Sequence, residues 1–265
     1  MEHERRRNHV ATVEGGSRNR LEGCPLPELI PRPDLLSAKR VLAVQPHPDD
    51  NEIGAGATIA RLAAQGAVIR YVTVTDGRLG TADPAISQDA LAARRHGEAE
   101  RAAAILGVQE HRHLGRRDLL DTALPGLREA ILEEVAAFRP DFVLTCDPWL
   151  PYEAHPDHRN VGLAVSEAVS FLGFPHVPGA PQEAPPQPMV AFYGTARPNA
   201  QIPGGPYWER KWQAIAAHET QFAEHFLPLM RAFFEARAVG EDGFFEAFKV
   251  LHPIYLHFNP GAVDA

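Results

Sequence analysis

The stretch VLAVQPHPDDNEIG (Val41–Gly54) joins an apolar run, typical of a buried strand, to a dense group of ionisable side chains. A second apolar run, DFVLTC (141–146), is followed in the same way by DPWLPYEAHPDH (147–158). HPDD and HPDH are near repeats of one another, and each comes shortly after the expected end of a strand. Two such coincidences in one chain indicate a functional site at the ends of these strands.

The chain around these motifs alternates strand-like and helix-like patterns. Strands are predicted at residues 40–45, 67–77, 110–115, 141–147 and 189–195. Helical spacing is found at residues 54–66, 87–107 (with Ser87 as the expected N-cap), 124–140, 158–173, 207–222 and 226–240. The Pro-rich segment from Phe174 to Pro188 is expected to be a loop. This alternation predicts an α/β fold with a parallel sheet and helices on both of its faces.

Length and composition bound the number of domains. At 265 residues and 45% hydrophobic content, the chain can bury a core as one α/β domain or as two small ones. No domain boundary is evident, so residues 22–265 are expected to form a single domain. Residues 1–21 contain ERRRN and EGGSRNR, which cannot bury apolar surface, and we expect a mobile tail there.

Charge and cysteine content argue against several classes of protein. The formal net charge is -8 and the pI about 5.9, so nucleic acid is not an expected partner. Cys24 and Cys146 are too few for a disulfide framework or a cysteine-type zinc site, and they suit a reducing cytoplasm. Residues 1–20 show no signal peptide, and no run approaches the ~18 apolar residues of a membrane span. We therefore expect a soluble, cytoplasmic protein without membrane contact.

Both motifs contain residue types that bind divalent metals. In an open parallel sheet, ligands bind at the carboxyl ends of the strands, where both motifs are expected to lie. A single divalent metal, zinc or another cation, fits on His47, Asp50 and His158, with an open position for water. Asp49 could then act as the general base, and His155, as imidazolium, could stabilise an oxyanion and protonate a leaving amine. Such a set hydrolyses an amide.

Simpler roles exist for each of these residues taken alone. An aspartate after a strand is most often a helix N-cap, and HPDH by itself could be a turn that opens a helix. Asp157 could orient one of the imidazoles, and Glu52 could support a ligand or merely be a first-turn acid of the next helix. Other histidines are expected to be surface or capping residues: His96, His111, His113, His176 and His252.

The paired motifs also carry a family resemblance. PHPDDNEIG and HPDHRNVG are similar to the signatures of the LmbE/PIG-L family of zinc-dependent N-acetylglucosamine deacetylases. The resemblance runs from about Val41 to Phe258 and includes TDGRLGT, ARRHGEAERAAAILGV, LGRRD, KWQAIAAHETQF and GFFEAFKV. The stretch DPWLPYEAHPDHR is most similar to the archaeal diacetylchitobiose deacetylases of that family, which suggests a homo-oligomer. The family implies a Rossmann-like sheet, one Zn²⁺ on His47, Asp50 and His158, Asp49 as base and His155 as acid.

Further positions carry over from the family. Arg95 matches an arginine that holds sugar hydroxyls, although an ion pair with Glu98 or Glu100 is the alternative. Asp118 matches an aspartate that accepts hydrogen bonds from the sugar, or it caps a turn. Relatives from thiol pathways carry an oxyanion-assisting tyrosine two residues before the HPDH histidine, where this chain has Glu153 beside Tyr152.

We therefore predict a hydrolase that removes the acetyl group from an N-acetylglucosamine-type amino sugar, such as N,N'-diacetylchitobiose or a similar conjugate. Trp149, Tyr152 and Trp208 could present aromatic faces to a sugar ring, and core or rim packing is the alternative for each. Rival hypotheses are a deacetylase of a thiol-cofactor precursor or an antibiotic amino sugar, a nucleotide-binding Rossmann fold, and a non-catalytic sugar- or metal-binding protein. The nucleotide hypothesis is poor because QPHPDD replaces a Gly-rich loop and its carboxylates would repel a pyrophosphate.

Overall fold

The computed structural model describes residues 30–241 and 243–257. The chain divides into two units, residues 1–31 and 32–265, and only Ile30 and Pro31 of the first are described. The predicted mobile tail at 1–21 and Cys24 lie outside the described residues, as does the predicted domain boundary at residue 22. No helix in the described part of the chain combines the length and the apolar character needed to cross a membrane.

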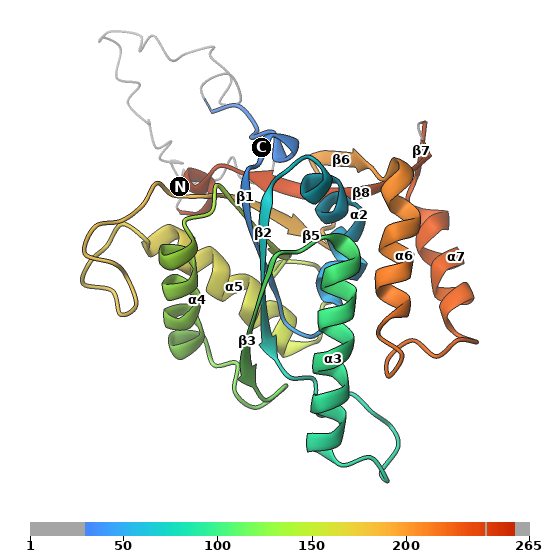
Figure 1. Cartoon of the computed structure of the whole chain (residues 1–265). Coiled ribbons are helices and arrows are strands. Elements are labelled where there is room, and N and C mark those ends of the chain that lie inside the picture. The colour runs from blue at the N-terminus through green and yellow to red at the C-terminus, as the bar shows by residue number, and fades with distance from the viewer. Residues whose placement is uncertain (1–29, 242, 258–265) are drawn as a thin grey trace, which may run out of the picture. The chain divides into compact units, whose positions relative to one another are not determined.

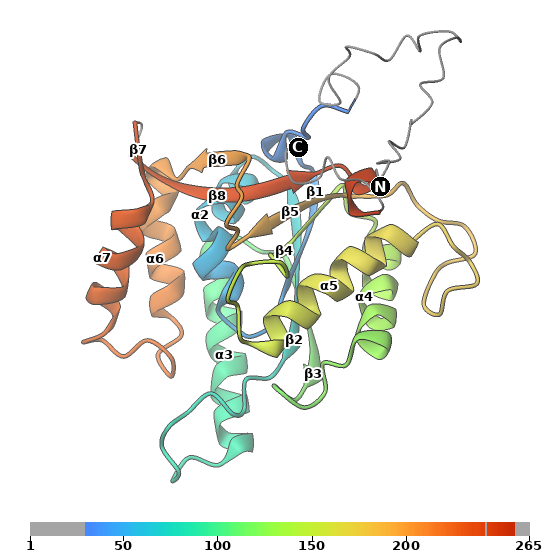
Figure 2. The same ribbon diagram turned by 180° about the vertical axis from the view of Figure 1, so that it is seen from behind.

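The larger unit is built on one mixed sheet (Figures 1 and 2). Its strands run in the order β3-β2-β1-β4-β5-β8-β6, and β7 pairs with β8. The neighbours from β3 to β5 are parallel, whereas β8 is antiparallel to β5, β6 and β7. Their bounds are β1 Arg40–Gln45, β2 Val68–Thr75, β3 Glu110–Arg116, β4 Phe142–Cys146, β5 Met189–Tyr193, β6 Ala200–Pro203, β7 Val239–Gly240 and β8 Gly243–Leu251.

Helices cover both faces of this sheet. In Figures 1 and 2, α4 and α5 pack together on one face, and α2, α3 and α6 lie on the other, with α7 beside α6. The helices are α2 Asp50–Ala64, α3 Gln88–Leu106, α4 Leu124–Phe138, α5 Pro156–Phe171, α6 Trp208–Ala216 and α7 Leu227–Arg237, with short 3₁₀ turns η1 Leu35–Ser37, η2 Gly205–Tyr207 and η3 Pro253–Leu256. The predicted α/β class, with a mostly parallel sheet between helices, is confirmed.

The central strands form the core. Every residue of β4 is buried, and so is β1 apart from Arg40, because helices cover both faces of these strands. Ser87 caps α3 as predicted, with its side chain accepting from the Ala90 amide. Residues 174–188 contain no helix or strand, also as predicted.

Three features differ from the sequence-based expectation. The helix α2 begins at Asp50 rather than Gly54, so the polar motif itself opens the helix. The helix predicted to run to residue 222 ends at Ala216 because the next turn diverges, with the Thr220 amide and hydroxyl both bound to Glu98 of α3. The antiparallel strands β6 and β8 were not predicted, since their pairing depends on distant partners rather than on local pattern.

Candidate metal centre

The sheet topology brings the two motifs together. The strands β1 and β4 are parallel neighbours, with Val41 opposite Phe142, so their carboxyl ends lie at the same edge. The helix α2 starts at Asp50 directly after β1, and α5 starts at Pro156 after the loop that follows β4. Both motifs therefore stand at the carboxyl edge of the sheet, where open α/β sheets bind ligands.

Three side chains at this edge form a compact ligand set. The ligand atoms of His47, Asp50 and His158 all lie within 4.8 Å of one another. Asp50 is central, with Oδ2 3.2 Å from His47 Nδ1 and Oδ1 3.4 Å from His158 Nε2. Two imidazole nitrogens and a carboxylate oxygen are a common catalytic zinc set, so the donors present fit a divalent cation that keeps an open position.

A buried carboxylate sets the tautomer of the first histidine. His47 Nε2–H donates to Asp157 Oδ2 over 3.1 Å, which leaves Nδ1 facing Asp50. Thr122 Oγ1 and the Leu119 amide also donate to Asp157. Burial alone would raise the pKa of Asp157, but these hydrogen bonds outweigh it and lower the pKa to about 2. Asp157 thus contacts the His47 imidazole, and its role in orienting that ring stays a prediction.

The second histidine has a matching partner that sequence reasoning did not assign. Glu153 Oε2 lies 3.2 Å from His158 Nδ1, and Oε1 accepts from the His155 amide over 2.8 Å. His158 thereby donates through Nδ1, which leaves Nε2 on the side of Asp50. Burial raises the pKa of Glu153, but the hydrogen bonds from His155 and His158 outweigh that effect, so it is lowered overall. A glutamate five residues before a candidate ligand, in the same loop, was the available signal.

Asp49 has an unusual backbone and a perturbed carboxyl. Its φ of 131° lies in a region that non-glycine residues rarely adopt, and such strain is typical of functional sites. Burial is the main cause that raises the pKa of Asp49 to about 7, the charge of Asp50 adds to it, and Arg95 opposes it. A buried carboxyl with a pKa near neutrality suits a general base.

Arg95 and Asp118 line the same small hollow as the ligand set, about 260 Å³ in volume. Arg95 donates to Asp49 Oδ2 at 3.1 Å and to Pro48 O at 2.9 Å, rather than pairing with the glutamates of its own helix. Asp118 accepts from the Leu79 amide through Oδ2, whereas its buried Oδ1 has no hydrogen-bond partner among the described residues.

His155 is the N-cap of α5, and its Nδ1 accepts from the Asp157 amide. Its Nε2 is therefore the nitrogen able to carry and transfer a proton. The ring stacks on His158 with a centroid distance of 4.8 Å. Burial lowers the pKa of His155, and the charges of His47 and His158 lower it further, so the expected imidazolium is disfavoured until a negative charge develops nearby.

Glu52 turns away from the ligand set. It is 1% exposed, and its Oε2 lies 3.5 Å from Nε2 of His218, which is fully buried. The carboxylate also raises the pKa of the buried Tyr71 hydroxyl, although burial is the larger cause. His218 belongs to the AHETQF stretch, and nothing in the local pattern indicated that it lies beneath the motif.

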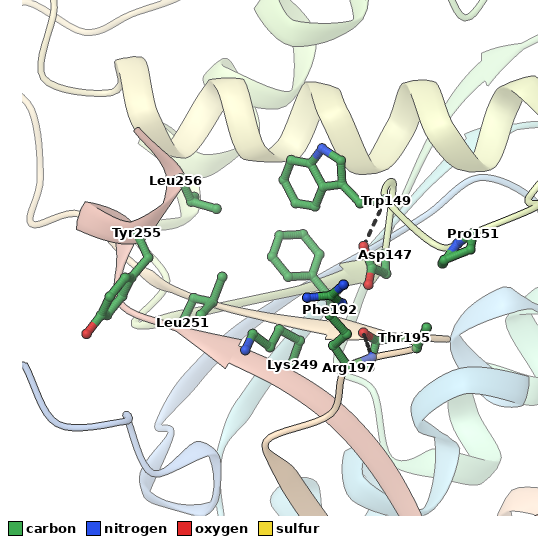
Figure 3. Close-up of a pocket in the computed structure, with 11 residues that line it drawn as sticks. Asp147, Trp149, Pro151, Phe192, Thr195, Arg197, Lys249, Leu251, Tyr255 and Leu256 are labelled. Carbon is green, nitrogen blue, oxygen red and sulfur yellow. Dashed lines mark hydrogen bonds between the residues drawn. The ribbon is translucent and has the colours of Figure 1, made fainter. Parts of the chain in front are cut away.

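The three aromatic residues occupy different environments. Trp149 lines a pocket of about 460 Å³ and stands over Phe192 in Figure 3, with ring centroids 5.6 Å apart. Asp147 and Thr195 line both this pocket and a neighbouring one, of about 450 Å³, that reaches Asp50 and His158. Tyr152 is fully exposed and lines none of these pockets, and Trp208 is buried against Phe244.

Comparison with known proteins identifies the family. The model of the PIG-L family, described as GlcNAc-PI de-N-acetylase, matches residues 42–169. The chain is 39% identical to a diacetylchitobiose deacetylase of Thermococcus kodakarensis, with 84% of this chain and 87% of the relative covered. The fold and this similarity define a class of deacetylases with an α/β fold, and the chain belongs to the PIG-L family.

One further relative and two solved structures extend this comparison. A probable N-acetyl-alpha-D-glucosaminyl L-malate deacetylase 2 of Bacillus anthracis is 33% identical, covering 80% of this chain and 92% of that protein. A solved structure of the N,N'-diacetylchitobiose deacetylase from Pyrococcus horikoshii superposes with a TM-score of 0.78 at 34% identity, covering 84% of this chain and 87% of that one. A hydratase, GalB from a Pseudomonas, shares the fold at 20% identity.

Proposed function

We propose that the protein removes the N-acetyl group from N-acetylglucosamine-type amino sugars, with N,N'-diacetylchitobiose or a similar conjugate as substrate. The observation that carries the proposal is the convergence of a two-histidine, one-aspartate ligand set with Asp49 and His155 on one hollow. A metal-binding protein without catalysis has no use for a strained, buried carboxyl whose pKa is raised to about 7. The relatives named above support the amino-sugar class.

The chain's own groups divide the reaction between them. A divalent cation on His47, Asp50 and His158 would polarise the amide carbonyl and lower the pKa of water. Asp49 takes a proton from the attacking water, and Arg95 holds that carboxylate in place. His155, through Nε2, stabilises the developing oxyanion and then gives a proton to the leaving amine.

Substrate contacts follow from groups that the protein leaves unpaired. Asp118 Oδ1 faces no partner among the described residues and lies beside the ligand set, so we assign it to a sugar hydroxyl. Arg95 donates a hydrogen bond to Asp49 and also lines the hollow. A second sugar would extend through the pocket beside Asp147 toward Trp149. Tyr152 would reach it only after its loop moves.

The proposal also includes the cation, the location and the oligomeric state of the protein. Zinc is the proposed cation because two imidazoles and one carboxylate suit it better than they suit magnesium or calcium. We also propose a cytoplasmic location and a homo-oligomer, as the resemblance implies.

Acetate release tests the function directly. Metal-free protein is supplied with Zn²⁺ and offered N-acetylglucosamine, diacetylchitobiose, an N-acetylglucosaminyl malate and an N-acetylglucosaminyl inositol. We expect zinc-dependent acetate release with diacetylchitobiose at least about fivefold better than the monosaccharide in kcat/KM, which corresponds to ~1 kcal/mol for one aromatic–sugar contact. Trp149→Ala should reduce that preference and leave the monosaccharide rate nearly unchanged.

Each other outcome has a definite meaning. A preference for the malate or inositol conjugate would move the assignment to a thiol-cofactor precursor, and equal rates for one and two sugars would indicate a one-sugar pocket. No acetate release from any amide, with metal bound, would reject the deacetylase.

A further inference from the structure

A second group of metal-ligating side chains lies away from the candidate metal centre, between helix α3 and strand β3. His96 and Glu100 stand one turn apart on α3, and His113 lies on β3 at the edge of the sheet. The ligand atoms of these three residues all lie within 4.8 Å of one another. The sequence alone predicts surface or capping roles for both histidines.

The contacts within this group converge on one carboxylate. His113 Nε2 lies 2.7 Å from Glu100 Oε1, and His111 Nδ1 lies 2.9 Å from the same oxygen. The rings of His96 and His113 are 4.1 Å apart, and those of His111 and His113 are 4.0 Å apart. Three imidazoles and one carboxylate thus lie side by side, and three of these residues, His96, Glu100 and His113, have the mutual distances of a ligand set.

His111 supplies an independent sign of a ligand. Its side chain is only 5% exposed, and its Nδ1 is not aligned for a hydrogen bond with Glu100 despite their short separation. Its other nitrogen, Nε2, lies 2.8 Å from Thr73 Oγ1, which in turn accepts from Gln45. A metal-binding histidine typically makes such a hydrogen bond through the nitrogen that does not face the cation.

We propose that His96, Glu100 and His113, with His111 behind them, form a second site for a divalent transition metal such as Zn²⁺. Nitrogen-rich donors favour Zn²⁺, Ni²⁺ or Cu²⁺ over Mg²⁺ and Ca²⁺. Zinc–nitrogen bonds are about 2.0–2.1 Å long. The bound cation links α3 to the edge strand β3.

Metal stoichiometry tests this site independently of the deacetylase proposal. Metal-free full-length protein is titrated with Zn²⁺ in a calorimeter, and bound zinc is then measured by elemental analysis after gel filtration. We expect two zinc ions per chain for the unchanged protein and one for His96→Ala, a substitution at an exposed position. His96→Ala should retain acetate release. His176→Ala removes an exposed imidazole elsewhere and should still bind two, and Mg²⁺ should produce no heat at this site.

Two further variants guard against misfolding and residual binding. Glu100→Gln keeps the shape of the side chain and should weaken the second binding event by about tenfold or more, as loss of a charged ligand does. The double variant His47→Ala/His158→Ala removes the first site and should still bind one Zn²⁺, with a zinc-dependent rise in melting temperature. Saturation of the unchanged protein at one ion, or two ions on His96→Ala, would overturn the proposal.

Discussion

The motifs HPDDNEIG and HPDHRNVG share the pattern H-P-D-x-x-x-x-G, but their helices begin at different points. The helix α2 starts at the fourth residue of the first motif, Asp50, whereas α5 starts at the second residue of the other, Pro156. The third residue is therefore outside the helix in one case and inside its first turn in the other. Asp49 has a φ of 131° and lines the hollow, and Asp157 is wholly buried beneath His47.

The first and fourth positions of the motifs complete the contrast. His47 is a candidate ligand, whereas His155 caps a helix and keeps one nitrogen for proton transfer. Within the set of His47, Asp50 and His158, only the fourth position, Asp50 or His158, contributes a ligand from both motifs. A two-residue difference in where a helix begins thus gives identical letters different chemical roles, and substitutions at matched positions can test that conclusion.

The largest difference is expected at the first position. His47→Ala removes a ligand, so we expect loss of bound metal and of all measurable activity, as for His158→Ala. His155→Ala should retain the metal but lose turnover by roughly 10²–10⁴-fold, the usual contribution of a positioned acid. Elemental analysis and acetate release on the same samples separate the two results. If His155→Ala lost its metal as well, the two histidines would share one role.

The pH profile of the same variant sharpens this test. With a carboxylate base and an imidazole acid, kcat/KM should rise and then fall across neutral pH. His155→Ala should abolish or move the falling limb, and an unchanged profile would remove His155 from the mechanism.

At the third position, we expect one substitution to impair turnover and the other to impair metal binding. Asp49→Asn is expected to bind metal normally and to lose turnover by roughly 10²–10⁴-fold, because the base is gone. Asp157→Asn weakens the partner of His47, so it should reduce metal affinity about 10–100-fold and regain activity in excess Zn²⁺. Kinetics over a range of Zn²⁺ concentrations distinguish them. Equal losses at saturating metal would contradict the division of roles.

The same two aspartates should affect stability with opposite signs. The pKa of Asp157 falls from 3.8 to about 2 on folding, so its charge stabilises the fold above about pH 4 by roughly 2 kcal/mol, and this is lost as pH falls toward 2. The pKa of Asp49 rises from 3.8 to about 7, so its ionisation destabilises the metal-free fold progressively between those values.

Melting temperatures of metal-free protein at pH 8 check this. Asp49→Asn should melt higher than the parent, and Asp157→Asn should melt lower. At pH 4 the gain from Asp49→Asn should vanish, because the parent carboxyl is then protonated in the folded state. A destabilising Asp49→Asn at pH 8 would show that its burial carries no electrostatic cost.

The smallest effects are expected for substitutions at the glycine that ends each motif. A Cβ on Gly54 would lie 2.2 Å from the Tyr193 ring, and one on Gly162 would lie 2.6 Å from the Cys146 carbonyl oxygen. Either alanine should cost about 1–3 kcal/mol by overpacking. Urea unfolding should show that Tyr193→Val offsets part of the cost of Gly54→Ala. Pro148→Ala should not rescue Gly162→Ala, since backbone blocks that site. If Pro148→Ala also restored stability to Gly162→Ala, the clash at Gly162 would be with a side chain rather than with the backbone.

Local pattern was sufficient for the parallel strands of the sheet but not for its antiparallel strands. The apolar runs at β1 and β4 predicted buried parallel strands because helices cover both faces, and this burial leaves a continuous hydrophobic signature. The strand β8 has no such signature, since its pairing with β5 and β6 depends on residues some 50 positions away in the chain, as between Phe192 and Lys249.

The same limit applies around the candidate site. Nothing near Glu52 indicated that His218 lies against it, and nothing near Glu100 indicated that two histidines of β3 converge on it. The side chain of Trp149, which could present its face to a sugar ring, lies over Phe192 in a pocket that adjoins the one reaching Asp50 and His158. Contacts between segments distant in sequence cannot be deduced from either segment alone.

The sequence by itself predicted the class of fold and the candidate ligands, because strand ends and His/Asp spacing are local properties. The tertiary structure alone decided how those side chains are arranged. It sets where each helix begins, and hence that Asp49 faces the hollow with a pKa of about 7 while Asp157 is buried with a pKa of about 2. It also brings Glu153 to His158 and Arg95 to Asp49. Burial and neighbouring charge set the protonation of a carboxyl group, and both exist only once the chain has folded.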